Sequence, residues 1–113
     1  MNILMVFKII AAIATVMTGL LALVKPTAVQ GFTWLKIDGA RGVSEVRAIF
    51  GGLFIALGLM PLFFVGMAYR MLGISYLAIA AVRAFSIIFE KSYDRSNWYS
   101  LAIEIVLGVI LVL

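Results

Sequence analysis

Two ionisable side chains lie inside long apolar runs of the sequence. Arg83 stands within AAVRAF and Glu104 within LAIEIVLG, and each has apolar residues directly on both sides. An ionised side chain in hydrocarbon is costly unless it is paired, protonated or hydrated. Buried groups of this kind bind polar ligands, form ion pairs or carry protons, so Arg83 and Glu104 are the first candidates for a functional site.

Helix geometry places Arg83 and Glu104 at a similar depth. Arg83 precedes Glu90 by seven residues, and Glu104 follows Trp98 by six. At about 1.5 Å of rise per residue, both side chains lie roughly 9–10 Å from the loop that joins their two segments. We therefore predict that the two segments form a hairpin and that Arg83 and Glu104 pair across it.

Helical periodicity brings further side chains to the same end of the protein. At 100° per residue, Tyr76 falls on the face of Arg83, and two polar side chains fall on the face of Glu104. Arg47 lies near the same end of an earlier segment, so we expect two arginines and up to three glutamates to converge. The competing interpretation is an ion-pair network that only fixes helix register. The candidate ligand-binding residues are Arg47, Arg83, Glu104, Glu45, Tyr76, Phe54, Ser100 and Asn97.

The composition excludes a soluble fold and several classes of chemistry. The 113-residue chain is 65% hydrophobic and 12% charged, with a mean hydropathy of +1.22, whereas soluble domains carry about 25% charged residues. It has no Cys and no His, so we expect no metal site, no cofactor and no thiol chemistry. The net charge of +4 comes without a basic patch. We expect it to face anionic lipid headgroups and not nucleic acid.

Four apolar segments would position these side chains. They span about residues 3–24, 43–67, 71–89 and 97–113, and a membrane-spanning helix needs about 20 residues. The last segment is short, at roughly 25 Å, unless its helix begins within residues 92–96. We predict an all-α fold in which residues 1–113 form a single domain, an integral membrane bundle of four transmembrane helices.

The loops predict how this bundle sits in the membrane. Residues 25–42 form the longest loop, and the apolar cluster around Trp34 predicts an interfacial or re-entrant piece. The basic residues of this loop and of residues 90–97 are Lys25, Lys36, Arg41, Lys91 and Arg95, whereas the opposite side has Lys8 and Arg70. The positive-inside rule therefore places both loops in the cytoplasm, in what we expect to be the bacterial inner membrane.

Small residues at four-residue steps predict where the helices touch. The rows are Ala11, Thr15 and Gly19, then Ala48, Gly52 and Ala56, and finally Ala80 and Ala84. Such rows let helix backbones approach closely in lipid. We therefore expect all three rows to lie at helix–helix contacts.

Several motifs occur in a familiar order, namely SEVRAIFGGLFIALGL, AAVRAF and LAIEIVLG after a Lys-Pro end of the first segment. Together they resemble, over nearly the whole chain, the small four-helix bacterial membrane proteins described as domain of unknown function 4345. More distantly they are similar to the DoxX-type membrane proteins, some of which are tied to respiratory or redox complexes. The most specific element is E-x-R-A-x-x-G-G, at Glu45, Arg47, Ala48, Gly51 and Gly52. The resemblance implies a four-helix bundle with candidate positions Glu45, Arg47, Arg83 and Glu104, and it implies no reaction.

Three classes of function fit these features. The leading hypothesis is a protein that binds a membrane lipid or lipid-like molecule, such as a lipid, fatty acid or quinone. Arg47 and Arg83 would anchor its head, and Phe54 and Tyr76 would hold its tail. One alternative is a small proton-coupled transporter that acts as a homo-oligomer, a dimer with Glu104 as the proton carrier. The other is an accessory subunit of a membrane complex. The sequence has no nucleophile, phosphate loop or metal ligand set that supports an enzyme.

Overall fold

The protein is helical throughout the part that the structure describes. The computed structural model describes residues 2–113, apart from the side chain of Phe32, and this part contains no strand. The elements in chain order are α1 (Ile3–Val24), α2 (Thr27–Thr33), α3 (Gly39–Glu45), the π-helix η1 (Val46–Leu53), α4 (Phe54–Phe63), α5 (Met67–Glu90) and α6 (Arg95–Val112). Because α3, η1 and α4 follow one another without a break, they form one helix from Gly39 to Phe63.

Four helices in the described part are long and apolar enough to cross a membrane. They are Ile3–Val24, Gly39–Phe63, Met67–Glu90 and Arg95–Val112. This confirms the predicted all-α fold with four candidate membrane spans. The first helix has the predicted bounds, and the fourth begins within the predicted window of residues 92–96. Its 18 residues rise about 27 Å, close to the roughly 30 Å thickness of a bilayer core.

The turn between the second and third spans lies earlier than the sequence predicts. Helix α4 ends at Phe63 and α5 begins at Met67, so both boundaries shift by four residues from the predicted segments 43–67 and 71–89. Pro61 lacks the N–H that continues a helix, and α4 ends two residues beyond it. Gly66 has a φ of 94°, which glycine adopts without a steric penalty. These two residues place the turn at residues 64–66.

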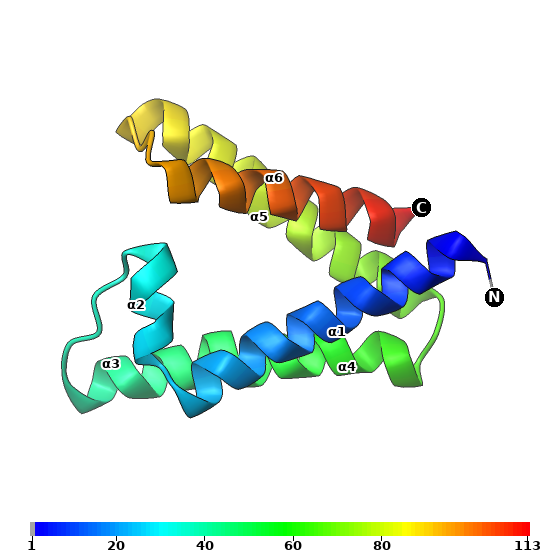
Figure 1. Cartoon of the computed structure of the whole chain (residues 1–113), viewed down its shortest axis with the longest axis horizontal. Coiled ribbons are helices and arrows are strands. Elements are labelled where there is room, and N and C mark those ends of the chain that lie inside the picture. Colours follow the sequence, from blue (N-terminus) through cyan, green and yellow to red (C-terminus); the bar gives the residue numbers. More distant parts are fainter. Residues whose placement is uncertain (1) are drawn as a thin grey trace.

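The four spans form two arms that meet at one end (Figure 1). Helix α1 packs along η1 and α4 to make the first arm, and α5 packs along α6 to make the second. Contacts between the arms are less extensive than those within them. Figure 1 shows the arms close together near both chain termini and spread apart at the other end, where α2 and α3 lie. The loops around residues 25–42 and 90–97 both lie at this open end.

Glycine residues allow the helices within each arm to approach closely. A Cβ atom added at Gly58 would lie 2.7 Å from the carbonyl oxygen of Ala12 and 2.8 Å from the backbone nitrogen of Val16. One added at Gly73 would lie 2.9 Å from the carbonyl oxygen of Gly108. Close packing of this kind holds helices together in lipid, where the hydrophobic effect between helices is absent.

The predicted rows of small residues have different outcomes. The row in α1 is confirmed, since Ala11, Thr15 and Gly19 are buried. The row in the second span is wrong, because Ala48, Gly52 and Ala56 are all exposed. The face that meets α1 carries Gly51 and Gly58 instead, since two glycines permit a closer approach than alanines do. In the third row, Ala80 is buried and Ala84 is half-buried.

The joint between the arms combines apolar packing with a hydrogen bond. Its buried cluster consists of Ala11, Ala12, Tyr69, Leu72 and Leu111. Thr15 donates its hydroxyl to the carbonyl oxygen of Ala11 at 2.9 Å. The oxygen of that hydroxyl is therefore left to accept from the hydroxyl of Tyr76, at 2.5 Å. This bond links α1 of the first arm to α5 of the second.

We expect Gly58→Ala to destabilise the protein by about 1–3 kcal/mol, because the added methyl group overpacks the contact with α1. Gly52→Ala is the matched control, since its Cβ would meet only the Arg47 carbonyl oxygen, at 4.0 Å. The control should change stability by less than about 1 kcal/mol. The measurement is the unfolding free energy of each variant in detergent on titration with SDS. Equal losses in the two variants would contradict the close approach at Gly58.

Candidate functional site

Arg83 and Glu104 form the predicted pair, and they do so through two parallel hydrogen bonds. The Nε of Arg83 donates to Oε1 of Glu104 at 2.7 Å, and Nη2 donates to Oε2 at 2.8 Å. The Glu104 side chain is only 11% exposed, whereas that of Arg83 is 31% exposed. Two charge-assisted bonds thus neutralise the carboxylate inside the bundle. The pair joins the two helices of the second arm.

Asn97 extends this polar group toward the loop between α5 and α6. Nη1 of Arg83 donates to Oδ1 of Asn97 at 2.8 Å. The amide nitrogen of Asn97 in turn donates to the carbonyl oxygen and the hydroxyl oxygen of Ser92, at 3.2 and 3.0 Å. Helix α6 begins only two residues before Asn97, so its first turn positions this amide. The guanidinium of Arg83 is therefore oriented from two directions.

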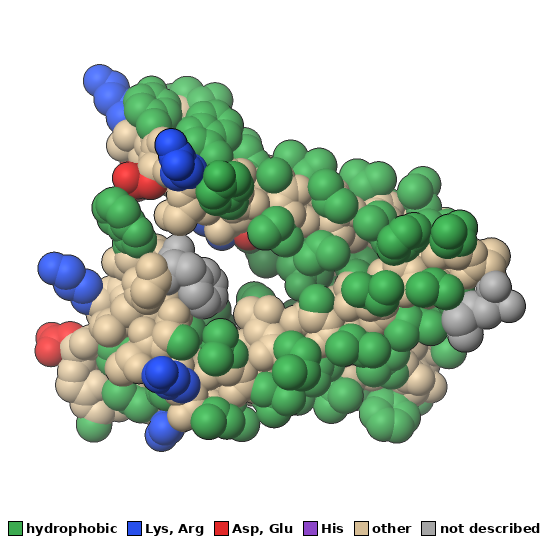
Figure 2. Space-filling model, in the orientation of Figure 1, with side chains coloured by type: hydrophobic (Ala, Val, Ile, Leu, Met, Phe, Trp, Pro, Cys, Tyr) green, Lys and Arg blue, Asp and Glu red, His purple; other side chains and the backbone are tan. Residues whose placement is uncertain are grey.

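Arg83 also faces a cleft between the two arms. The cleft has a volume of about 350 Å³ and lies at the open end of the molecule, where Figure 2 shows a hollow between the arms. Its walls are formed by Thr33, Trp34, Leu35, Phe50, Arg83, Ser92, Asp94, Ser96, Asn97 and Ser100. Seven of these ten side chains are polar or charged, and the apolar ones are Trp34, Leu35 and Phe50.

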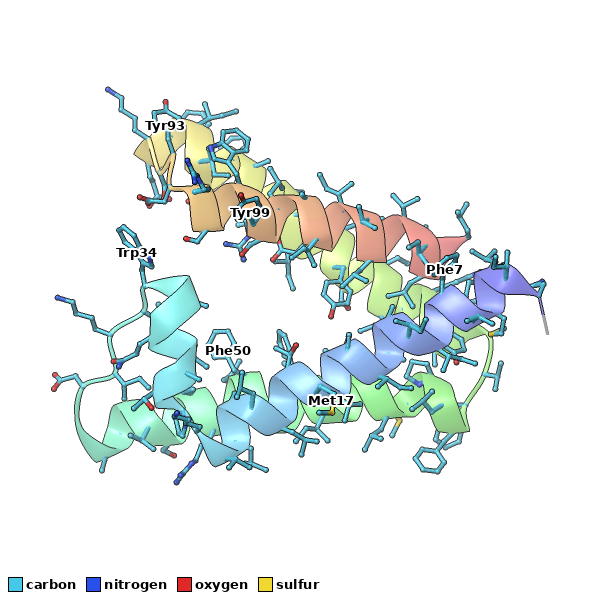
Figure 3. All side chains as sticks on the ribbon, in the orientation of Figure 1. Phe7, Met17, Trp34, Phe50, Tyr93 and Tyr99 are labelled. Carbon is cyan, nitrogen blue, oxygen red and sulfur yellow. The ribbon has the colours of Figure 1, made fainter. Side chains whose placement is uncertain are left out.

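The loop of residues 25–42 supplies one wall of this cleft. Helix α2 packs against α1 and contacts α6, and Figure 1 shows it rising from the first arm toward the second. Val29 of α2 is 3% exposed, and its side chain anchors this helix on the first arm. Trp34 follows α2, and in Figure 3 its ring lies at the open end and is directed toward the second arm. The loop thus folds back between the arms.

Two phenylalanines of the first arm line the space between the arms. Figure 3 shows Phe50 directed from η1 into this space, and its ring centroid lies 5.9 Å from that of Phe54. Phe54 and Tyr76 line a second, narrow cavity of about 20 Å³, nearer the joint. Phe54 and Tyr76 therefore lie close to each other, about one helical turn or more away from the cleft at Arg83.

The structure does not bring Arg47 to Arg83. The Nε of Arg47 donates to the carbonyl oxygen of Leu23 at 3.0 Å, near the C-terminus of α1, where a cation is favourable. Arg47 lies on the helix face that also carries Gly51 and Gly58, and this face packs against α1. The prediction that Arg47 and Arg83 converge on one site is therefore wrong. The close glycine contact turns Arg47 toward the end of α1 and away from the cleft.

Glu45 and Glu90 also remain outside the cluster. Glu45 pairs with Arg41 on the surface at 3.2 Å, and Glu90 accepts a hydrogen bond from the hydroxyl of Ser86 at 2.7 Å. Both glutamates are exposed, Glu90 as the last residue of α5 and Glu45 within the first two turns of the helix from Gly39 to Phe63, so their side chains reach water easily. The predicted residues that do meet at the cleft are Arg83, Asn97, Ser100 and, behind Arg83, Glu104.

Sequence reasoning does not place Trp34, Phe50 and Asp94 in the site. The signal for Trp34 is the aromatic, apolar character of the long loop, which predicts a piece that returns to the bundle. Phe50 lies one turn before Phe54 and shares its side of the helix, so helical spacing is its signal. Asp94 belongs to a short loop without periodicity, and nothing in the pattern indicates where its carboxylate lies.

Comparisons with family models, curated proteins and solved structures give no match to this chain. The resemblance to the domain of unknown function 4345 therefore stays a prediction from its motifs. Among the described residues, no group of three His, Cys, Asp or Glu side chains is placed to hold a metal ion. The fold and the cleft define a class, which is a four-span helical bundle with a partly polar cleft between two helical arms.

We expect the loss of one member of the charged pair to cost more than the loss of both. Arg83→Met leaves a buried, unpaired carboxylate at Glu104 and should destabilise the protein by about 3 kcal/mol. The double variant Arg83→Met/Glu104→Leu removes both charges and should recover most of that loss. SDS unfolding of the wild type, Arg83→Met, Glu104→Leu and the double variant gives the coupling energy. Strictly additive losses would show that the pair is not coupled.

Proposed function

We propose that the protein binds a small amphipathic molecule, such as a lipid, fatty acid or quinone, in the cleft between its arms. The observation that carries this proposal is the position of Arg83. Glu104 and Asn97 accept three hydrogen bonds from it, while a guanidinium has five N–H donors. Two donors therefore have no partner among the described residues, on a side chain that lines a cavity. A pair needed only for helix packing has no reason to face this space.

An outward-facing groove beside the cleft would accommodate the tail of such a ligand. Arg83 and Asn97 also line a groove of about 510 Å³, whose other walls include Ile79 and Val82 of α5. Val82 is 71% exposed, so this groove faces outward, toward the surrounding lipid. A head group bonded to Arg83 would leave an acyl chain free to lie along these apolar side chains.

The end of α2 places Trp34 at the cleft mouth. Trp34 is the C-cap residue of α2, with a φ of 67°, and its backbone N–H donates to the carbonyl oxygen of Gln30 at 3.1 Å. A left-handed residue commonly ends a helix in this way. Trp34 is exposed and lines the cleft, so its ring can close over a bound head group.

We further propose that the protein resides in the bacterial inner membrane with the cleft open to the cytoplasmic side. The loops of residues 25–42 and 90–97 both lie at the open end of the arms. Most of the basic residues of the chain belong to these loops, and the positive-inside rule places such loops in the cytoplasm.

Proton-coupled transport receives less support from the same geometry. Both oxygens of Glu104 accept hydrogen bonds from Arg83, so a proton arriving at Glu104 would have to displace a charge-assisted bond. A flux assay in liposomes under a pH gradient, with Glu104→Gln as the comparison, tests this alternative. Uptake of a solute that depends on Glu104 would favour the transporter over the binding protein.

We expect the wild-type protein, extracted in mild detergent, to carry a small-molecule adduct in native mass spectrometry. The double variant Arg83→Met/Glu104→Leu should lose up to about 90% of this adduct, because a head group that loses donors worth ~1.4 kcal/mol binds tenfold more weakly. Arg70→Met is the matched control, since this exposed arginine lies at the opposite end of α5. It should keep the adduct. A wild-type protein without adduct, or a folded double variant with wild-type occupancy, would contradict the proposal.

A further inference from the structure

The charged groups at the cleft restrict which head group can bind. Glu104 neutralises Arg83 through two hydrogen bonds, and Asp94 contributes a second carboxylate to the cleft wall. Arg83 is the one basic side chain among the described residues that line the cleft. Together the three groups carry one net negative charge. An anionic head group would therefore meet repulsion where a salt bridge to a free arginine would otherwise attract it.

The other basic residues at the open end do not change this balance. Arg47 donates to the carbonyl oxygen of Leu23 and does not line the cleft. Lys36 and Arg95 are exposed and line none of the cleft, so water and salt screen their charges. The cleft thus holds no cation that is free of a carboxylate partner among the described residues.

What the cleft does offer is a set of neutral hydrogen-bonding contacts. The guanidinium plane of Arg83 keeps one N–H on Nη1 and one on Nη2 beyond those bonded to Glu104 and Asn97. The hydroxyls of Ser96 and Ser100 line the same cleft and can donate to a ligand as well. Donors in this arrangement suit the oxygen of a carbonyl group, which accepts two hydrogen bonds and brings no charge.

We infer that the ligand carries an uncharged head with a carbonyl acceptor, and that Asp94 excludes fatty acids and other anionic lipids. The inference rests on the proposed function, because it concerns the same cleft. Neutral esters and neutral amides of fatty acids share the required chemistry. The sequence-based expectation of a head group anchored by two arginines is replaced, since only one arginine reaches the cleft and its charge is already matched.

The test compares three probes that have the same acyl chain. They are monoolein, oleamide and oleate, the last at alkaline pH where its carboxyl group is ionised. The chain contains two tryptophans, so the full-length Trp98→Phe variant makes Trp34 the single reporter of ligand at the cleft. We expect monoolein or oleamide to change its fluorescence at concentrations about tenfold below those that oleate needs, which corresponds to ~1.4 kcal/mol. Comparing monoolein with oleamide distinguishes an ester carbonyl from an amide carbonyl.

Asp94→Asn, in the same single-tryptophan protein, is the matched variant. Asp94 is the N-cap residue of α6, and asparagine serves as well as aspartate at that position. The substitution removes the charge, so it should strengthen oleate binding about tenfold relative to its effect on the two neutral probes.

Tighter or equal binding of oleate by the Asp94-containing protein would overturn the inference about charge and leave the proposed function standing. If Asp94→Asn changes the binding of all three probes equally, the inference about charge also fails and the proposed function still stands. If none of the three probes changes the fluorescence of Trp34, both the inference and the proposed function fail.

Discussion

A charged pair inside an apolar helical hairpin is the constraint on which the rest of this structure depends. Glu104 is buried in α6, and Arg83 reaches both of its oxygens only in one register of α5 against α6. The same register sets Gly73 against Gly108 and brings Asn97 to Nη1 of Arg83. The hydrogen bonds of Arg83 thus hold the second arm at one height, and the close approach of the two helix backbones at Gly73 and Gly108 holds it at another. Because the guanidinium is fixed in this way, its remaining donors have a defined place.

The cleft exists because each arm packs more closely within itself than against its neighbour. Glycines bring α1 onto the second span and α5 onto α6, whereas the arms meet through an apolar cluster and the Thr15–Tyr76 hydrogen bond near the termini. At the other end the arms diverge, and the short helix α2 with Trp34 occupies part of the mouth. A space lined by one oriented arginine, several hydroxyls and aromatic rings is thereby left open toward the loops.

Depth and face counting located Arg83, Glu104 and Asn97 because all three lie on the regular helices of one hairpin. There, sequence separation converts directly into height and angle. The same method assigned Arg47 the correct face, shared with Gly51 and Gly58, and the wrong neighbour. A helical face that carries glycines packs against the helix that can approach it most closely. Here that helix is α1. Periodicity contains no information about this choice.

Composition and periodicity alone determine the lipid environment, the four apolar spans, and the charged pair of the last two helices. Each of these is a local property, readable from apolar length, residue type or spacing within one hairpin. The division into two arms, the meeting of Trp34, Phe50 and Asp94 at one cleft, and the net charge of that cleft arise only in the tertiary structure. They depend on which faces of distant helices permit the closest backbone approach, and this comparison involves the whole chain at once.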